Sequence, residues 1–170
     1  MLNRSQIQNL IQKHNLVEEY INIDKQLTPA GFDLTVGKVF KFCSMGSLDF
    51  SNSDRQLPQV EEIFPQKITP EDKFGWRPLP KGAYKVRTNE TVNIPNNLTA
   101  LAFSRTSLLR MGAFTQHGAW DAGFRGRGEF ILVVENPFGI RLKENARIVQ
   151  LVFLKTDETE SYKGIYNHLK

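Results

Sequence analysis

A short stretch in the second half of the chain combines charged and hydroxyl side chains in a pattern that suits phosphate chemistry. It runs from Ser104 to Arg110 and places Arg105 and Arg110 on either side of Thr106 and Ser107. Guanidinium groups, hydroxyls and backbone amides at the start of a helix are the donors that proteins use to hold phosphates. A capped helical turn with two solvated arginines has the same residues, so this stretch alone leaves both interpretations open.

A second stretch, residues 118–126, reads Gly-Ala-Trp-Asp-Ala-Gly-Phe-Arg-Gly. Asp121 stands between Trp120 and a glycine turn, and Phe124 follows the turn. In a hairpin of this kind the carboxylate can act as a general base on water, the phenyl ring can support a sugar, and the backbone can bind a base edge. An ordinary Asp–Gly turn with aromatic neighbours in the core is the alternative.

Three further positions carry possible ligands. Asp33 alternates with Phe32 and Leu34, which turns it away from their face of a strand. It can hold Mg²⁺ directly or through water, although a single aspartate is more often structural. Tyr162 and Tyr166 lie in a polar tail that either closes over a bound nucleotide or frays as a chain end.

Other kinds of site find little support. The three histidines, His14, His117 and His168, lack the spacing of metal ligands, so we expect no zinc site. His117 lies beside the expected hairpin, where it would contact a ligand or simply be exposed. The chain contains no Gly-x-Gly-x-x-Gly motif, no Walker phosphate loop and no serine nucleophile elbow.

The elements that position these residues are predicted to be short strands. Leu98–Ser104 and Phe130–Glu135 are typical, and turn sequences such as Pro95-Asn-Asn97 and Asn136-Pro-Phe-Gly139 separate them. Strands are also expected at Ala83–Arg87, Glu90–Ile94, Gly112–Phe114, Ile140–Leu142 and Ile148–Leu154. A helix from Ser5, as N-cap, to about Tyr20 precedes them. The pattern predicts a mainly β fold, a barrel or jelly roll.

The composition sets the broad class. With 170 residues the chain is expected to form one domain over residues 1–155, followed by an arm over residues 156–170. The net charge of +4 is scattered, which predicts no nucleic-acid partner and suits a pocket for a small polyanion. A single cysteine, the lack of a signal-like start and the lack of a long apolar run predict a cytoplasmic protein without a membrane contact.

The order of these motifs resembles the dUTPase / dCTP deaminase superfamily, and most closely its archaeal-type dUTPases. The resemblance runs from about residue 25 to the end, and the hairpin is its most specific part. It rests on Pro29-Ala-Gly-Phe-Asp-Leu34, Ser104-Arg-Thr-Ser-Leu108, Gly118-Ala-Trp-Asp-Ala-Gly-Phe-Arg-Gly126, Ala146-Arg-Ile-Val-Gln-Leu151 and Tyr162-Lys-Gly-Ile-Tyr166.

The resemblance implies a distorted jelly-roll-like β-barrel with an N-terminal helix. It also implies a homotrimer with active sites shared between subunits, and hydrolysis of dUTP to dUMP and pyrophosphate with Mg²⁺ carried on the triphosphate. Asp121 would be the general base, and Asp33 would support the metal or the wall of the site. Phosphate binding falls to Arg105, Thr106, Ser107, Arg110 and Gln150. Binding of the base and deoxyribose falls to Gln116, His117, Gly118, Ala119, Phe124, Tyr162 and Tyr166.

Two alternatives to a diphosphatase stay open. The deaminases that this chain resembles place a glutamate ten residues after the aspartate, where this sequence has Ile131, or Val133 if the strand is longer. Neither side chain can carry a proton. Glu129 or Glu135 would reach the site only through a bulge, which we consider the weaker hypothesis. A binding protein without catalytic activity is the second alternative, and residues 46–73 have no assigned role.

Overall fold

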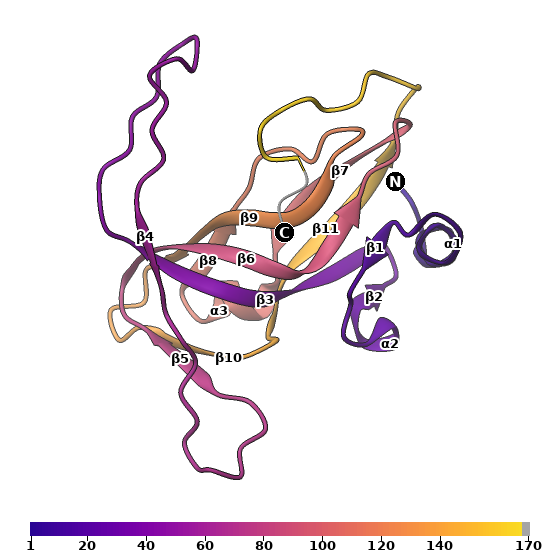
Figure 1. Ribbon diagram of the computed structural model, residues 1–170. Helices are drawn as coiled ribbons and strands as arrows, with labels where there is room; N and C mark the ends of the chain where they lie inside the picture. The colour runs from indigo at the N-terminus through magenta and orange to yellow at the C-terminus, as the bar shows by residue number, and fades with distance from the viewer. Residues whose placement is uncertain (168–170) are drawn as a thin grey trace.

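The computed structural model describes residues 1–167, which form a mainly β fold with three helices (Figure 1). The helices are α1 (Arg4–His14), α2 (Ile23–Gln26) and α3 (Thr106–Arg110). The strands are β1 (Val17–Glu18), β2 (Leu27–Thr28), β3 (Gly31–Phe42), β4 (Val60–Glu62), β5 (Trp76–Leu79), β6 (Gly82–Asn93), β7 (Leu98–Ser104), β8 (Ala113–Gln116), β9 (Arg125–Val134), β10 (Ile140–Lys143) and β11 (Arg147–Lys155).

Nine of these strands form one antiparallel sheet that curls into a nearly closed barrel. Its order is β7-β11-β3-β6-β9-β8, with β1 beside β6 and with β2 and β4 beside β3. The two end strands approach each other, because the Thr115 amide on β8 donates to the Ser104 hydroxyl on β7 at 2.8 Å. β5 and β10 form a separate two-stranded sheet. The prediction of a mainly β, barrel-like fold is therefore confirmed.

Alternation of side chains along the strands builds the core. On β6 every second residue from Tyr84 to Val92 is buried, including the polar Thr88 and Glu90, while the residues between them are partly exposed. Phe32 and Leu34 on β3 are fully buried, together with Leu132 on β9 and with Leu151 and Phe153 on β11. Burial of these apolar side chains is the main force that closes the sheet.

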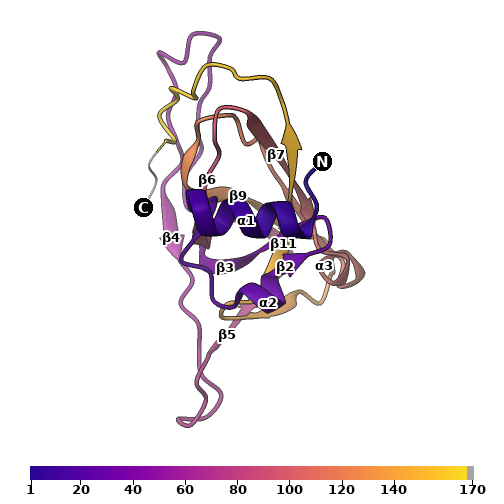
Figure 2. The same ribbon diagram turned by 90° about the vertical axis from the view of Figure 1, so that its right-hand side faces the viewer.

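The N-terminal helix is shorter than the sequence predicted. Asn3, not Ser5, is the N-cap, and the helix ends at His14 because Asn15 adopts the left-handed conformation at φ 53°. Leu16 and Val17 continue the apolar pattern, but they enter the core beside β6 instead. Figure 2 shows α1 lying across one side of the barrel, where Ile7 and Ile11 are buried.

The strands also differ in detail from the prediction. Ala83–Arg87 and Glu90–Ile94 belong to one strand, β6, whose pairing with β9 shifts register between Arg87 and Thr91. β9 begins at Arg125, five residues earlier than predicted, so the chain turns directly from the hairpin into the sheet. No helix within residues 1–167 is long and apolar enough to cross a membrane.

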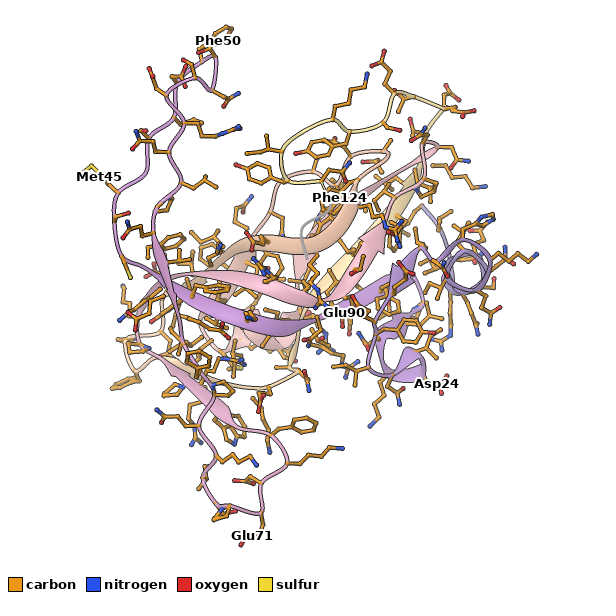
Figure 3. The ribbon with its side chains drawn as sticks, viewed as in Figure 1. Asp24, Met45, Phe50, Glu71, Glu90 and Phe124 are labelled. Carbon is orange, nitrogen blue, oxygen red and sulfur yellow. The ribbon has the colours of Figure 1, made fainter. Side chains whose placement is uncertain are left out.

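The segment without an assigned role forms two long excursions at opposite ends of the molecule (Figures 1 and 2). One connects β3 to β4 and carries the exposed side chains of Met45 and Phe50; the other connects β4 to β5 and has Glu71 near its tip (Figure 3).

Candidate active site

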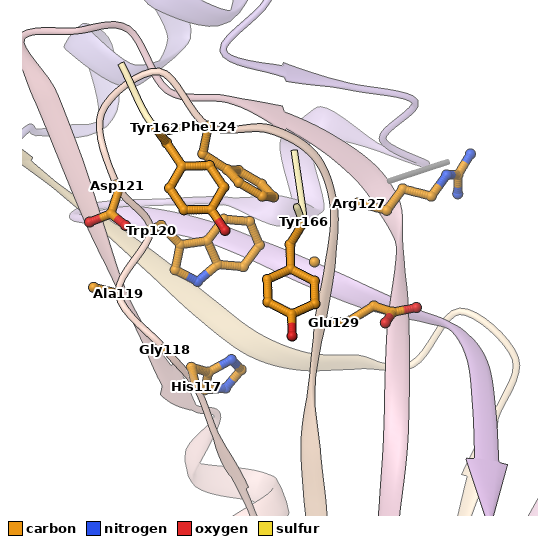
Figure 4. A pocket seen from close by; sticks show the side chains of 11 residues that line it. His117, Gly118, Ala119, Trp120, Asp121, Phe124, Arg127, Glu129, Tyr162 and Tyr166 are labelled. Carbon is orange, nitrogen blue, oxygen red and sulfur yellow. The ribbon is translucent and has the colours of Figure 1, made fainter. Parts of the chain in front are cut away.

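The expected hairpin closes one side of a pocket of about 330 Å³ (Figure 4). Backbone bonds between Trp120 and Ala100, at 3.0 and 3.1 Å, tie the hairpin to β7. Gly123 supplies the turn at φ 77°, and its amide donates to the Ile94 carbonyl at 2.8 Å. The pocket is lined by His117, Gly118, Ala119, Trp120, Asp121, Phe124, Arg127, Gly128, Glu129, Tyr162 and Tyr166.

Asp121 lies at the edge of this pocket with its side chain exposed. The next residue, Ala122, is buried, so the turn presses its methyl group into the protein and leaves the carboxylate outside. No hydrogen bond or ion pair from residues 1–167 reaches that carboxylate. An unpaired, solvated carboxylate beside a pocket is free to accept a proton from water.

Aromatic side chains make the wall next to Asp121. The Trp120 and Phe124 rings meet edge to face at 5.3 Å, and the Phe124 and Tyr162 rings lie 6.0 Å apart. Gly128 lets Trp120 lie close to β9, because a Cβ at position 128 would stand 2.4 Å from the indole. The result is a flat apolar surface suited to a sugar or a base.

The C-terminal arm returns to the pocket of its own chain. The Tyr162 amide donates to the Ala122 carbonyl at 2.7 Å, and the Asn167 side chain accepts from the Arg125 amide at 2.8 Å. Tyr162 and Tyr166 thus line the pocket that the sequence assigned to them (Figure 4). Residues 168–170 of the predicted arm lie outside the described residues.

Glu129 also reaches the pocket wall, without a bulge in its own strand. Its carboxylate accepts from the Arg87 Nε at 2.8 Å and lies 3.3 Å from the Lys85 ammonium. Lys85 and Arg87 each pair with one of the two carboxylate oxygens, so Glu129 is held in a charge-assisted network along the wall. Glu135 instead makes an exposed ion pair with Lys81 at 2.8 Å.

His117 is the only one of the described histidines that lines this pocket. Its Nε2 lies 2.8 Å from the Thr115 hydroxyl, and its ring contacts the Phe130 ring at 4.3 Å between centroids. Burial lowers the pKa of His117 from 6.5 to about 4, because a charged ring would lose its hydration. The imidazole is therefore neutral near pH 7.

A second pocket of about 240 Å³ brings together most of the predicted phosphate ligands. It is lined by Thr28, Asp33, Ser104, Arg105, Thr106, Ser107 and Gln150. None of these residues lines the larger pocket. Arg110 and Gln116 line neither pocket, and both are exposed.

Asp33 holds the arginine of this second pocket in place. Its carboxylate is 3% exposed and lies 2.9 Å from the Arg105 Nε and 3.2 Å from an Arg147 terminal nitrogen. Burial raises the pKa of Asp33, and the two guanidiniums oppose that effect. Within residues 1–167, no group of three or more His, Cys, Asp or Glu side chains is placed to hold a metal ion.

Sequence reasoning missed several of these contributors. Arg127 lines the larger pocket, while Thr28 and Ser104 line the smaller one. Gly126 and Gly128 alternate with Arg127 and Glu129 along β9, which places Arg127 and Glu129 on one face of the strand. This alternation could have predicted that both side chains line the same pocket. The sequence around Thr28 does not predict its place in the smaller pocket, because Thr28 reaches this pocket only through the pairing of β2 with β3.

The sequence pattern of a family described as dCTP deaminase-like matches residues 1–156. The chain belongs to the dCTP deaminase-like family. Among similar members, a protein of Methanosarcina acetivorans is 43% identical over 171 residues, which covers 99% of this chain and 96% of that protein. A protein of Archaeoglobus fulgidus is 40% identical over 167 residues, covering 98% and 95%. Both carry the name "Probable deoxyuridine 5'-triphosphate nucleotidohydrolase".

A solved structure supports the fold of the family member described here. The 2'-deoxycytidine 5'-triphosphate deaminase of Agrobacterium tumefaciens matches with a TM-score of 0.63 at 19% identity. The match covers 89% of this chain and 46% of that longer one. Because the two sequences are only 19% identical, this likeness supports the fold alone. The chemistry is inferred from the residues that line the two pockets.

Proposed function

We propose that this protein hydrolyses dUTP to dUMP and pyrophosphate. The observation that carries the proposal is the unpaired Asp121 carboxylate at the edge of an aromatic pocket of nucleoside size. The names of relatives about 40% identical over nearly the whole chain support the same activity.

In the proposed reaction Asp121 accepts a proton from water while the water oxygen attacks the α-phosphorus. The bond from that phosphorus to the oxygen bridging the α- and β-phosphates breaks, and pyrophosphate leaves with the bond electrons. Phe124 and Trp120 pack against the deoxyribose and leave little room for a 2'-hydroxyl. The hairpin backbone from Gln116 to Ala119 binds the base. Tyr162 and Tyr166 cover the nucleotide and exclude bulk water.

We further propose that each active site is shared between subunits of a homotrimer. Asp121 lines one pocket and Arg105 the other, and the two pockets share no residue within one chain. Large apolar side chains are also exposed along the segment from β7 through α3 to β8, which is typical of an interface. They are Leu101, Phe103, Leu109, Met111 and Phe114.

Mg²⁺ belongs to the same proposal, as an ion that arrives on the triphosphate. Mg²⁺ prefers phosphate oxygens, water and few carboxylates. The described residues fit this role better than a protein-bound ion, since Asp33 already faces two guanidiniums. When bound, the ion neutralises charge on the phosphate oxygens, and Arg105, Thr106, Ser107 and Gln150 orient them. We also propose a cytoplasmic location, which the free, exposed thiol of Cys43 favours.

Deamination of dCTP is the second candidate, favoured by the presence of Glu129 in the larger pocket. A deaminase needs a group that moves protons between water and the base. Lys85 and Arg87 already occupy the two carboxylate oxygens of Glu129, so neither oxygen is left unpaired to exchange a proton with a base. The geometry therefore supports hydrolysis better.

Purified protein with Mg²⁺ should release pyrophosphate from dUTP and no ammonia from dCTP. Asp121→Asn should abolish turnover while nucleotide binding survives, and Asp157→Asn, an exposed acid of the arm, serves as the control. Ammonia from dCTP would establish the deaminase instead. Neither product, together with intact nucleotide binding, would indicate a binding protein without catalytic activity.

Shared sites predict complementation between two inactive variants. Asp121→Asn and Arg105→Ala each inactivate every site of a uniform trimer. After the two are unfolded and refolded together, mixed trimers contain some sites in which both residues are intact. Partial recovery of activity is expected, and no recovery would place both residues of a site in one chain.

A further inference from the structure

The excursion that connects β3 to β4 is an ordered hairpin. Ser47 and Gln56 pair across it through two backbone hydrogen bonds of 2.9 and 3.0 Å. The Asp49 carboxylate accepts a hydrogen bond from the Asp54 amide at 3.0 Å, which closes the tip of the hairpin. Hydrogen bonds within the excursion therefore fix the backbone on either side of Arg55.

Arg55 is the side chain that this hairpin directs toward the C-terminal arm. Residues 51–54 and 56–57 are exposed, whereas Arg55 is partly buried. Its guanidinium carbon lies 5.9 Å from the centre of the Tyr166 ring, within the range of a cation–π contact. Figure 2 shows the arm beside the excursion. Within residues 1–167 no hydrogen bond or ion pair reaches this guanidinium, so no carboxylate competes with the ring for it.

Tyr166 is a pocket residue whose own bonds do not fix its ring. The arm is tied to the hairpin by the amide of Tyr162 and by the side chain of Asn167. These bonds hold the backbone on both sides of Tyr166. The Tyr166 side chain makes no hydrogen bond within residues 1–167 and is 38% exposed, although it lines the larger pocket. An exposed side chain of this kind changes rotamer rapidly unless another group holds it.

We propose that Arg55 is a positioning residue that holds the Tyr166 ring against the larger pocket, and so against the nucleotide bound there. Arg55 acts through the ring and does not itself contact the substrate. The inference rests on the proposed function, because that function places the nucleotide in this pocket. One exposed cation–π contact corresponds to about a two- to fivefold change in a binding constant.

The first test measures nucleotide binding by calorimetry, without turnover. The two probes are dUMP and a dUTP analogue with an imido group between the α- and β-phosphates. Arg55→Ala should weaken both by the same factor, about two- to fivefold, and Arg55→Lys should restore part of the loss, since it keeps a cation. Lys67→Ala removes one positive charge from the exposed surface of the other excursion and should change neither constant.

A double-mutant cycle then separates positioning from direct contact with the substrate. Arg55→Ala should have no further effect in the Tyr166→Leu background, which lacks the ring. A remaining loss in that background, or a larger loss for the dUTP analogue than for dUMP, would assign Arg55 to the phosphates and overturn the proposal. Unchanged dissociation constants in Arg55→Ala would overturn it as well.

The second test needs no nucleotide. A lysine-specific protease should cleave the arm at Lys163 about two- to fivefold faster in Arg55→Ala than in the wild type, and equal rates would contradict the proposal. The two hypotheses fail separately. A protein that shows these effects of Arg55 without hydrolysing dUTP contradicts only the proposed reaction. A protein that hydrolyses dUTP, with unchanged binding and cleavage in Arg55→Ala, contradicts only the role of Arg55.

Discussion

Burial of His117 should make the stability of the folded protein depend on pH. The folded pKa is about 4, against 6.5 for an exposed histidine. The folded state thus binds this proton less readily than the unfolded state, and its contribution to stability is lost as the pH falls from 6.5 toward 4. Each pH unit between the two values corresponds to about 1.4 kcal/mol, so the complete loss is about 3 kcal/mol.

The variant His117→Gln isolates this contribution, because glutamine does not titrate. Urea unfolding of both proteins at pH 7.5, 6.5, 5.5 and 4.5, at one fixed protein concentration, gives the free energy of unfolding at each pH. Between pH 7.5 and 4.5 the wild type should lose about 2.5 kcal/mol more than the variant. Buried carboxyls such as Asp33 and Glu90, whose pKa values burial raises, act in the opposite sense and cancel in the comparison.

Equal losses in the two proteins would refute this reasoning. They would mean that water reaches the His117 ring in the folded state, for example when the arm opens. A smaller loss in the wild type than in the variant would contradict the sign of the pKa change itself.

Three other perturbations test how the pockets are built. Gly128→Ala should displace Trp120, at a cost of about 1–3 kcal/mol in urea unfolding, and should change tryptophan fluorescence and raise the KM for dUTP. Asp33→Ala should lower the free energy of unfolding by about 2 kcal/mol, because the two partly exposed guanidiniums of Arg105 and Arg147 lose their partner. A changed Mg²⁺ requirement with unchanged stability would instead assign Asp33 to the metal. Gly123→Ala places a Cβ on a residue at φ 77° and 2.5 Å from Ser161 of the arm, which should displace the arm from the hairpin. Limited proteolysis should then cleave the arm faster. An unchanged rate of cleavage would show that the arm docks independently of the hairpin.

Much of the barrel could be predicted because its strands carry their own pattern. Residues 84–87 alternate apolar and polar side chains and residues 130–134 form a short apolar run, and turn sequences bound both, so local chemistry specifies the strands. The end of α1 could not be predicted in the same way. Leu16 and Val17 extend the helical spacing of Leu10, and only the conformation of Asn15 shows that the chain leaves the helix.

The roles of individual polar residues depended on partners that are far away in the sequence. In the sequence, no cation stands next to Asp33 on its strand. In the folded chain its carboxylate lies between Arg105 and Arg147, both more than 70 residues away in the sequence. Glu90, inside the barrel in Figure 3, is kept there by Thr35 and Gln26. Strand register creates these pairs, and a single sequence does not reveal it.

The same argument bears on the choice between hydrolysis and deamination. A carboxylate in a nucleotide pocket is a candidate acid or base, but the charged groups around it determine which proton transfers it can perform. Strand β6 places two cations beside Glu129, whereas the hairpin leaves Asp121 unpaired within residues 1–167. Asp121 can therefore accept a proton from water, and Glu129 is suited to hold its wall of the pocket in place. The position of these two cations therefore favours the proposed hydrolysis over deamination.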